Sequence, residues 1–340
     1  MKPIAVVLLA AGKGTRMKSE LAKVRHPLCG RPMIYYSVAS ALSLQPQRLV
    51  TVIGHQGEQV RAEVQALFPK AAIDFAVQKT QDGTGHAVLQ AKRALRGYDG
   101  DVLILSGDVP LLRAETLREF RRLHNKTGMD MSVLATIMPD PTGYGRCVVG
   151  EGGLLDEIVE ERDATPVQRQ IDIINAGIYL VDAKLLWWAL GRIGKDNAQG
   201  ELYLTDVIKL ARARGKAVRA FIMDESEEVL GINSRVELAE AAEMIRGEIV
   251  FHLMIEGVTA VDPHATYLDV GVKVGRDTVL EPGVALRGAT SVGKDCTIGA
   301  GAQIADCTIG AGANIGPYAV LRGVKVKAGE TIAPHEIREK

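Results

Sequence analysis

Hydrophobic and polar residues follow one another in blocks, and the first block is the clearest. Residues 4–9 form an uninterrupted apolar run, which predicts a strand buried on both faces of a sheet. Small residues follow, and then Gly12, Lys13, Gly14 and Arg16. Because glycine lacks a Cβ atom, successive N–H groups of such a turn can point at the oxygens of one phosphate. The pattern favours a nucleotide-binding loop, and a plain tight turn is the alternative.

Helical and strand patterns then alternate up to residue 105. Apolar residues at helical spacing predict helices over residues 33–44, 59–67 and 87–95. Short apolar runs predict strands over residues 49–53, 73–77 and 102–105. This alternation predicts an α/β, Rossmann-like domain, in which helices cover both faces of a parallel sheet and ligands bind at the carboxyl ends of its strands.

From residue 130 the pattern becomes rich in strands. Apolar segments predict strands over residues 131–137, 155–160, 173–181 and 218–222, and helices over residues 185–190 and 204–213. We interpret this region as a substrate-binding insertion at the edge of the parallel sheet.

The last hundred residues carry a different period. Residues 234–257 predict a long helix, after which apolar residues recur every six residues, with occasional steps of five: Val274, Leu280, Leu286, Val292, Ile298, Ile304, Ile309, Ile315, Leu321, Val326 and Ile332. A six-residue repeat rich in glycine and alanine predicts a short parallel β-helix of about four coils, and it resembles the left-handed hexapeptide helices of acyltransferases. The expected domains are the α/β domain (1–233), a linker helix (234–257) and the β-helix (258–340).

Composition excludes several classes of partner. Lys and Arg together number 41, as do Asp and Glu, so the chain offers no general surface for nucleic acid. The four cysteines are scattered, which is typical of reduced thiols in a cytoplasmic protein. No segment approaches the roughly 20 apolar residues of a membrane span. We therefore expect a cytoplasmic protein with no membrane partner.

Two further strand ends carry residues capable of chemistry. Gln78 precedes a Gly-Thr-Gly turn containing Gly83 and Thr84, where free N–H groups at a helix start can contact a base or a sugar. Asp108 follows the apolar run 102–105 and is suited to hold Mg²⁺ against a triphosphate. An ordinary helix-starting turn and a turn-forming aspartate are the respective alternatives.

The strand-rich region adds candidates for binding a sugar. Gly145 permits close approach of a ligand to the backbone, and the side chains of Glu160 and Asn175 can hydrogen-bond sugar hydroxyls. The alternative for Glu160 and for Asn175, each considered alone, is an ordinary solvated polar residue at the end of a strand.

Several motifs together resemble one enzyme family. The segments LLAAGKGTRM, QDGTGHA, SGDVPL, DPTGYGR, IVEERDAT, RQIDIINAGIY, GELYLTDVI and GINSR are similar, in order and spacing, to the uridyltransferase half of the bifunctional N-acetylglucosamine-1-phosphate uridyltransferase and glucosamine-1-phosphate acetyltransferase. They cover roughly the first 235 residues, so the resemblance implies that residues 1–233 are a nucleotidyltransferase domain. The resemblance implies a UDP-N-acetylglucosamine pyrophosphorylase, which transfers UMP from UTP to N-acetylglucosamine-1-phosphate and supplies precursors of cell-envelope polysaccharides such as peptidoglycan.

The resemblance also implies roles for individual residues. Uracil, ribose and phosphate binding falls to Leu9, Ala10, Ala11, Gly12, Lys13, Gln78 and Gly83. Thr84, Gly145, Glu160 and Asn175 would hold the sugar, and Arg16 and Lys23 would be catalytic. Asp108 and Asn233 would ligate Mg²⁺, the expected cofactor. The β-helix implies a homotrimer.

The chain departs from this family at two places. Ala22 stands where relatives usually have proline before the lysine, which could loosen the placement of Lys23. The later coils with the acetyl-transfer residues have no counterpart, and His335 is a poor candidate for the base, so we expect no acetyltransferase activity. Transfer to another sugar-1-phosphate, or non-catalytic binding of a sugar nucleotide, are the alternative functions.

Overall fold

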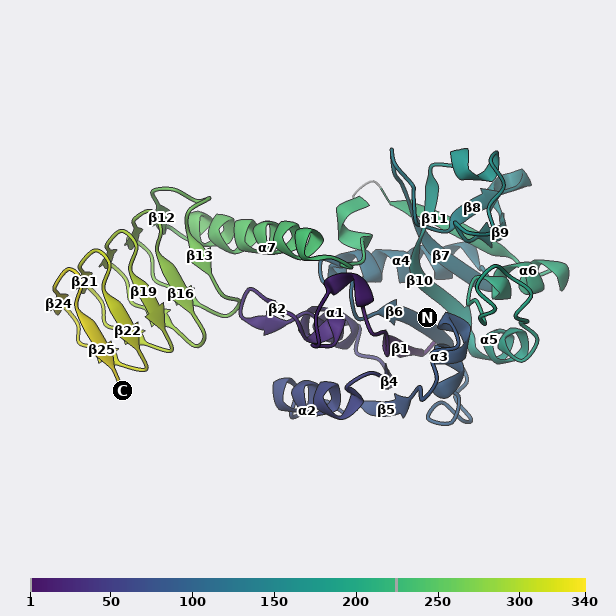
Figure 1. The fold of residues 1–340 in the computed structure, drawn as a ribbon, viewed down its shortest axis with the longest axis horizontal. Coiled ribbons are helices and arrows are strands. Elements are labelled where there is room, and N and C mark those ends of the chain that lie inside the picture. Colours follow the sequence, from purple (N-terminus) through teal and green to yellow (C-terminus); the bar gives the residue numbers. More distant parts are fainter. Residues whose placement is uncertain (1, 224–225) are drawn as a thin grey trace. The chain divides into compact units, whose positions relative to one another are not determined.

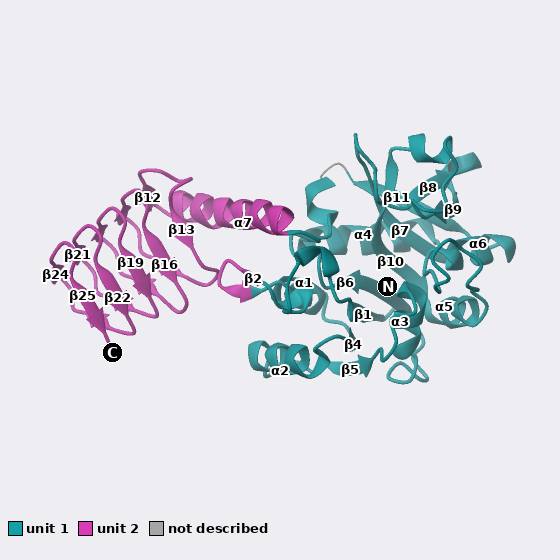
Figure 2. Ribbon diagram, in the orientation of Figure 1, with its two compact units in different colours: residues 1–26, 32–234 teal, residues 27–31, 235–340 magenta. Residues whose placement is uncertain are grey.

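The computed structural model describes residues 2–223 and 226–340, and the chain divides into two compact units (Figures 1 and 2). Unit 1 comprises residues 1–26 and 32–234. Unit 2 comprises residues 235–340 together with the short segment 27–31. Part of the N-terminal sequence therefore belongs to the second unit, which the local sequence pattern did not indicate.

Unit 1 is organised around a single mixed sheet, which has nine strands within the described residues. Its main path runs in the order β11-β7-β10-β6-β1-β4-β5, with β8 paired to β10 and to β9. The strands are β1 (Ile4–Ala10), β4 (Arg48–Ile53), β5 (Asp74–Val77), β6 (Asp101–Ser106), β7 (Met131–Ile137), β8 (Arg146–Val149), β9 (Leu155–Val159), β10 (Ile173–Asp182) and β11 (Val218–Met223).

Helices cover both faces of this sheet, as the alternating pattern predicted. They are α1 (Ile34–Ser43), α2 (Gly57–Leu67), α3 (Thr84–Gln90), α4 (Ala114–Thr127), α5 (Ala183–Leu190) and α6 (Asp206–Ala213). The predicted helix over residues 87–95 begins three residues earlier and ends at Gln90.

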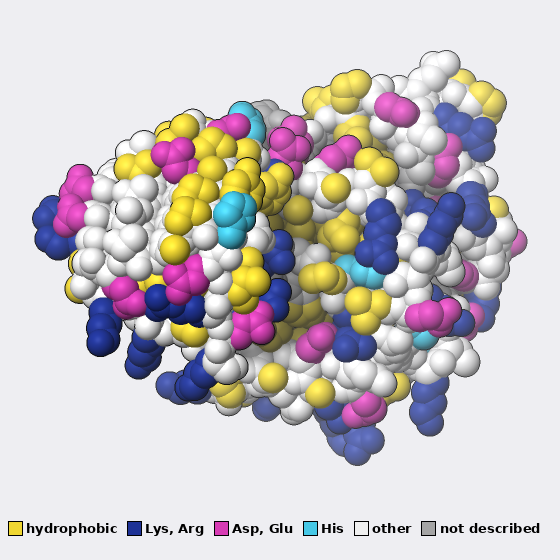
Figure 3. Space-filling view, turned by 60° about the vertical axis from the view of Figure 1, so that its left-hand side comes forward, with side chains coloured by type: hydrophobic (Ala, Val, Ile, Leu, Met, Phe, Trp, Pro, Cys, Tyr) yellow, Lys and Arg dark blue, Asp and Glu magenta, His cyan; other side chains and the backbone are white. Residues whose placement is uncertain are grey.

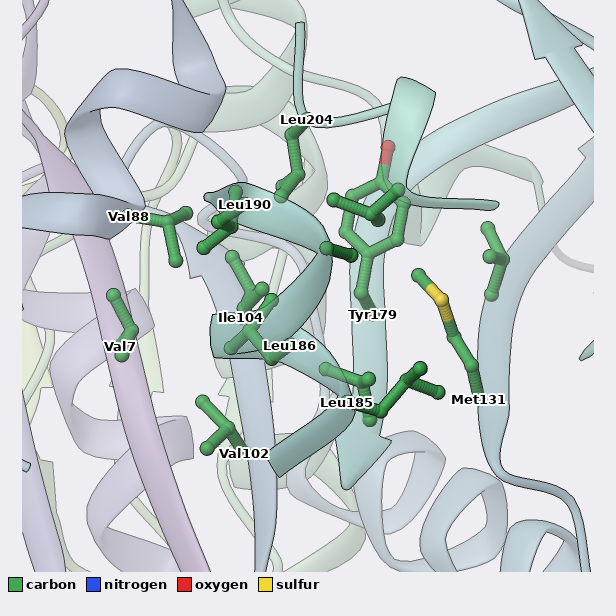
Figure 4. Packing of buried hydrophobic residues seen from close by; sticks show 14 of the residues in the cluster. Val7, Val88, Val102, Ile104, Met131, Tyr179, Leu185, Leu186, Leu190 and Leu204 are labelled. Carbon is green, nitrogen blue, oxygen red and sulfur yellow. The ribbon is translucent and has the colours of Figure 1, made fainter. Parts of the chain in front are cut away.

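The side chains of β1 alternate between two buried cores. Ala5 and Val7 face the core shared with α3, α5 and α6, whereas Val6 and Leu8 face the core shared with α1, α2 and α4. Figure 4 shows the first of these cores, where Leu186 of α5 and Val88 of α3 converge on the strands of the sheet. A strand buried on both faces needs a continuous apolar run, which is the pattern of residues 4–9.

The prediction of an insertion at the edge of the sheet after residue 130 is wrong. Strands β7 and β10 are not an insertion at the edge, because both lie on the main path of the sheet and β10 pairs antiparallel with β6 and with β7. Of the nine strands that the described residues form in this sheet, β8 and β9 alone lie off that path. The sheet is therefore mixed rather than parallel, and the apolar pattern missed this because a strand buried on both faces reads the same in either direction.

Unit 2 consists of helix α7 (Arg235–Ile255) and a solenoid of short parallel strands. Residues 256–340, all of them described, form three sheets with five, five and four strands. The first contains β12 (Thr259–Ala260), β15 (Val279–Leu280), β18 (Thr297–Ile298), β21 (Asn314–Ile315) and β24 (Thr331–Ile332). The second contains β13 (Tyr267–Leu268), β16 (Ala285–Arg287), β19 (Gln303–Ala305), β22 (Val320–Arg322) and β25 (Ile337–Glu339). The third contains β14 (Lys273–Val274), β17 (Ser291–Val292), β20 (Thr308–Ile309) and β23 (Lys325–Val326).

The six-residue repeat supplies the core of this solenoid. Leu286, Ile304 and Leu321 stack in successive coils and are at most 1% exposed. Each coil buries its apolar corner only against its neighbours, so the coils stabilise one another in series. Among the described residues, we find no helix that is both long and apolar enough to cross a membrane.

Removal of one side chain from this stack should be costly. Ile298 is fully buried, so we expect Ile298→Ala to lower the local unfolding free energy of the solenoid by about 2–5 kcal/mol through lost contacts and a residual cavity. Hydrogen exchange of the solenoid amides measures this quantity. Thr297→Ala, at the exposed neighbouring position, is the matched control and should change the exchange little.

Candidate functional site

A pocket of about 300 Å³ lies at the carboxyl ends of β1 and β6 in unit 1. Its lining includes backbone and side chains from the loop that follows β1, from the turn before α3, and from the segment after β6. The Gly107 N–H donates to the Leu9 carbonyl (2.8 Å), which holds the end of β6 beside that of β1. The pocket therefore occupies the edge where an α/β sheet binds ligands.

The glycine loop brings Lys23 to this pocket. Gly14 has a φ of 66°, and a Cβ atom at this position would lie 2.5 Å from Lys23 Cβ. Only glycine can combine this left-handed backbone with such close approach. Lys23, the first residue of a short 3₁₀ helix (Lys23–Arg25), thus lies with its aliphatic stem against the loop.

The Lys23 ammonium joins two segments that are distant in sequence. Its Nζ atom donates to Asn233 Oδ1 (2.9 Å) and forms a close ion pair with the Asp108 carboxylate. The Lys23 and Asp108 side chains are only 13% and 20% exposed, so water screens their attraction less than at the surface. The Ile232 N–H also donates to the Asp108 carbonyl (2.8 Å), which holds the two segments together through the backbone.

Asp108 and Asn233 are suited to hold a divalent metal. Their side-chain oxygens already converge on one cationic group, the Lys23 ammonium, and carboxylate and amide oxygens are the ligands that Mg²⁺ prefers. No cluster of three or more His, Cys, Asp or Glu side chains with metal-binding potential occurs within residues 2–223 and 226–340. This pair therefore suits a cation that takes its other ligands from phosphate and water.

Three of the predicted sugar-binding residues form a second cluster. A Cβ atom on Gly145 would lie 3.5 Å from Glu160 Oε2 and 3.7 Å from Asn175 Cβ, and the Asn175 N–H donates to the Gly145 carbonyl (2.9 Å). Glu160 Oε1 accepts from the Thr205 hydroxyl (3.1 Å). Burial raises the pKa of the Glu160 carboxyl, and the nearby Asp163 and Asp206 raise it further against the effect of the Thr205 hydrogen bond.

The segment over residues 201–205 connects this cluster to the pocket. Its Leu204 N–H donates to the Thr84 hydroxyl (3.1 Å), and Thr84 lines the pocket. Glu201 lines the pocket as well, while Thr205 contacts Glu160. The two groups of candidate residues are thus neighbours in one unit.

The sequence-predicted residues occupy four kinds of position. The pocket is lined by Leu9, Ala10, Ala11, Gly12, Lys23, Gln78, Gly83, Thr84 and Asp108. Gly145, Glu160 and Asn175 form the second cluster, and Asn233 contacts Lys23. Lys13 and Arg16 are exposed on the glycine loop and do not line the pocket.

Sequence reasoning missed several residues of the site. Gln81 lines the pocket and donates to the Ala11 carbonyl (3.0 Å), and it lies within the QDGTGHA motif that was already of interest. Ser106 and Glu201 also line the pocket. Thr205 carries no local signal, because only the tertiary fold brings it to Glu160.

A larger depression of about 1080 Å³ lies elsewhere, along the edge strand β5. Its lining includes Lys92, Arg93 and Arg96 but none of the residues that the sequence analysis selected. The residues that could bind a nucleotide or a metal therefore favour the smaller pocket as the functional site.

Two family patterns match the chain. The nucleotidyl transferase family matches residues 5–272, and the bacterial transferase hexapeptide family (six repeats) matches residues 289–323. Together with the α/β unit and the short-strand solenoid, these matches confirm the predicted fold class.

Three proteins similar to this chain each bear the name Bifunctional protein GlmU. The protein from Geobacter metallireducens is 49% identical over 304 residues, which cover 89% of this chain and 63% of that protein. The protein from Anaeromyxobacter dehalogenans is 46% identical over 332 residues, covering 98% of this chain and 68% of the relative. The protein from Listeria welshimeri is 44% identical over 299 residues, which cover 88% of this chain and 64% of that protein. The chain thus spans a little under two thirds of the first of these proteins.

The raised pKa of Glu160 predicts a pH-dependent stability. A carboxyl whose folded-state pKa lies above its unfolded-state pKa adds stability at low pH, and this contribution is lost as pH rises through the folded-state pKa. Glu160→Gln cannot lose a proton, so its melting temperature should rise relative to wild type as pH increases from about 4 upward.

Glu119 provides the control of opposite sign. A hydrogen bond from Arg122 lowers the pKa of the Glu119 carboxyl, so Glu119→Gln should lose a little stability relative to wild type as pH rises. Equal melting-temperature differences for Glu160→Gln at all pH values would contradict the assignment of a buried, charge-penalised carboxyl.

Proposed function

Because this chain belongs to the GlmU family and carries its nucleotidyl transferase domain, we propose that it transfers UMP from UTP to N-acetylglucosamine-1-phosphate. The products would be UDP-N-acetylglucosamine and pyrophosphate. The observation that carries the proposal is the convergence of Lys23, Asp108 and Asn233 beside the glycine-lined pocket.

The reaction requires positioning and charge neutralisation rather than a covalent nucleophile. An oxygen of the sugar phosphate attacks the α-phosphorus of UTP, the bond to the β-phosphate oxygen breaks, and pyrophosphate leaves with that electron pair. Both reactants are anionic, so cations must offset their repulsion. The Lys23 ammonium is preorganised for this task by the Gly14 contact and by the Asp108 ion pair.

The proposal divides the candidate residues by role. Nucleotide binding is assigned to Leu9, Ala10, Ala11, Gly12, Lys13, Gln78 and Gly83, and sugar binding to Thr84, Gly145, Glu160 and Asn175. Arg16 and Lys23 would stabilise charge in the transition state. Asp108 and Asn233 would hold Mg²⁺, which would neutralise phosphate charge when bound.

The adjacent cluster favours an N-acetylated sugar over a simple one. Glu160 and Asn175 lie beside Gly145, which is buried with its Cα packed against Ile158, and their side chains offer both acceptors and a donor. Another sugar-1-phosphate and non-catalytic binding are the competing hypotheses. The convergence of a lysine, a carboxylate and an amide supports catalysis over binding alone. A site that only binds a sugar nucleotide has less need of a metal-ligating pair beside a lysine.

One assay separates these hypotheses. The purified protein, UTP and Mg²⁺ are combined with a panel of sugar-1-phosphates, and pyrophosphate release is measured. The proposal requires the highest kcat/KM with N-acetylglucosamine-1-phosphate. A higher kcat/KM with glucose-1-phosphate would support transfer to another sugar-1-phosphate. No pyrophosphate release with any sugar would support non-catalytic binding.

The solenoid carries a proposal of its own. The predicted absence of acetyltransferase activity stays a prediction, which an assay with acetyl-CoA and glucosamine-1-phosphate tests. We also propose that unit 2 forms a homotrimer. Figure 3 shows hydrophobic side chains gathered on unit 2, where exposed residues include Phe251, Ile255, Tyr267 and Ile337.

The sheet that contains β13 is better suited to association than the sheet that contains β14. Across β13, β16, β19, β22 and β25 the register aligns Tyr267, Ala285, Gln303, Val320 and Ile337. Ala285 is buried and Gln303 is polar, so the apolar ladder at the surface of this sheet consists of Tyr267, Val320 and Ile337. The equivalent positions of the β14 sheet are Lys273, Ser291, Thr308 and Lys325. An apolar ladder can be buried between copies at lower desolvation cost than a polar, charged one.

Substitution of Arg16 should affect catalysis more than folding. Because its side chain is exposed on the glycine loop, we expect Arg16→Ala to keep the wild-type melting temperature. Loss of a group that stabilises the transition state should lower kcat by about a hundredfold or more. Steady-state pyrophosphate release measures the effect, and Arg118→Ala on α4 is the control; an Arg16→Ala variant with near-normal synthesis would reject the role.

Light scattering tests the proposed assembly. We expect a trimeric mass for the wild type, and a shift toward the monomer for Val320→Glu, which places a charge on the apolar ladder. Thr308→Glu, on the polar sheet, should keep the wild-type mass. A monomeric wild type over a wide range of concentrations would count against assembly.

A further inference from the structure

The segment that leads to Lys23 has an irregular backbone and is held by a side chain from another element. Gln56, which immediately precedes α2, contacts this segment at three points. Gln56 Oε1 accepts from the Ala22 N–H (3.0 Å) and from Arg25 Nη1 (3.1 Å), and Gln56 Nε2 donates to the Glu20 carbonyl (2.8 Å). These bonds lie on both sides of Lys23 in the sequence.

The pattern of donors and acceptors determines the orientation of the Gln56 amide. Its oxygen faces two N–H groups and its nitrogen faces a carbonyl, so the flipped amide would oppose donor to donor and acceptor to acceptor. Arg25 is fixed in turn by Glu63 of α2, with its Nε atom 3.0 Å from Glu63 Oε2. Gln56, just before α2, and Glu63, in the middle of α2, thus anchor the lysine segment.

Gln56 itself is anchored to the glycine loop. Its backbone is left-handed, with a φ of 52°, which is uncommon for a residue with a side chain. The preceding His55 N–H donates to the Ala11 carbonyl (3.3 Å), and a Cβ atom on Gly54 would lie 2.7 Å from the same oxygen. The turn before α2 therefore lies against the loop that lines the pocket.

Ala22 shows why this support is needed. Its φ of −56° lies in the range that a proline ring enforces, and its ψ of 138° is one that proline also adopts, yet alanine does not fix its own φ. Ala22 is 1% exposed, and its N–H, which proline would lack, is the group bound by Gln56. The hydrogen bond from the Ala22 N–H to Gln56 thus helps to hold Ala22 in a conformation that proline would favour through its own ring.

We propose that Gln56 is a positioning residue for Lys23, whose side-chain amide holds residues 20–25 so that the ammonium meets Asp108 and Asn233. The kinetic part of its test rests on the proposed uridylyl transfer, whereas the structural part does not. Gln56 contacts no reacting group in this arrangement and acts through the backbone of the lysine segment.

Loss of the Gln56 amide should therefore displace the lysine without unfolding the protein. We expect Gln56→Ala to lower kcat by about tenfold to a hundredfold, because small displacements of a catalytic group have large effects on rate. Gln56→Asn is a second variant: it keeps an amide, is shorter by one methylene, and tolerates the left-handed backbone well. It should fold and still lose activity, while Gln59→Ala, an exposed glutamine of α2, should have no effect.

Restoration by proline distinguishes positioning from a general structural role. Ala22→Pro, added to Gln56→Ala, should recover most of the lost kcat, because the ring restores the required φ and the shortened side chain leaves space for it. Ala22→Pro added to Lys23→Ala should recover nothing. A Gln56→Ala variant with wild-type kcat, or one that Ala22→Pro leaves uncorrected, would overturn the proposal.

Hydrogen exchange of the ligand-free protein tests the same idea without any activity. The amides of Arg25 and His26 donate to the carbonyls of Ala22 and Lys23 (2.9 and 3.2 Å), so they report on the order of the segment. We expect faster exchange of these amides in Gln56→Ala and wild-type rates in the double variant with Ala22→Pro. If the wild type releases no pyrophosphate, the proposed function fails, and unchanged exchange in Gln56→Ala would separately reject the role of Gln56.

Discussion

The ion pair between Lys23 and Asp108, extended by Asn233, is the constraint on which the site depends. A partly buried ammonium and carboxylate are stable only when each finds the other in good geometry, because neither is fully hydrated. The three residues come from three separate segments of the chain. The sheet, the glycine loop and the turn before α7 must therefore all be in place before this contact can form.

The second cluster holds the Glu160 carboxyl in an environment that disfavours its charged form. Glu160 is held next to Asp163 and Asp206 in surroundings that raise the pKa of its carboxyl. A polar group kept in such a place reduces stability and is typical of positions that serve a ligand rather than the fold. Its hydrogen bond to Thr205 gives the carboxyl a fixed orientation, and the link from Leu204 to Thr84 fixes that segment relative to the pocket.

The two units solve the burial of apolar surface in different ways. Unit 1 has two cores, one on each face of its sheet, and its strands are apolar on both sides. Unit 2 has one core, to which the short strands, the turns between them and helix α7 all contribute, while the residues that point outward from the strands are free to vary. That freedom explains how one solenoid sheet can present an apolar ladder while another presents lysine and threonine without loss of the coil.

Local patterns in the sequence were sufficient for much of this protein. The apolar run of β1, the glycines after it and the six-residue period of the solenoid are all short-range features, and the residues concerned occupy the predicted elements. The resemblance carried by the ordered motifs was confirmed by the relatives and by the matching family patterns. Asn233 came from that resemblance, since a turn residue carries no signal of its own.

Other features were decided only by the tertiary structure. The antiparallel direction of β10, the place of residues 27–31 in unit 2, and the contacts of Thr205 and Gln56 depend on which distant segments pack together. A pattern of apolar residues records whether a position is buried, but it does not record which partner buries it or in which direction a neighbouring strand runs. For that reason the sequence alone predicted the loop that carries Lys23 and the chemistry of its side chain, whereas packing determined what the side chain meets and what holds it there.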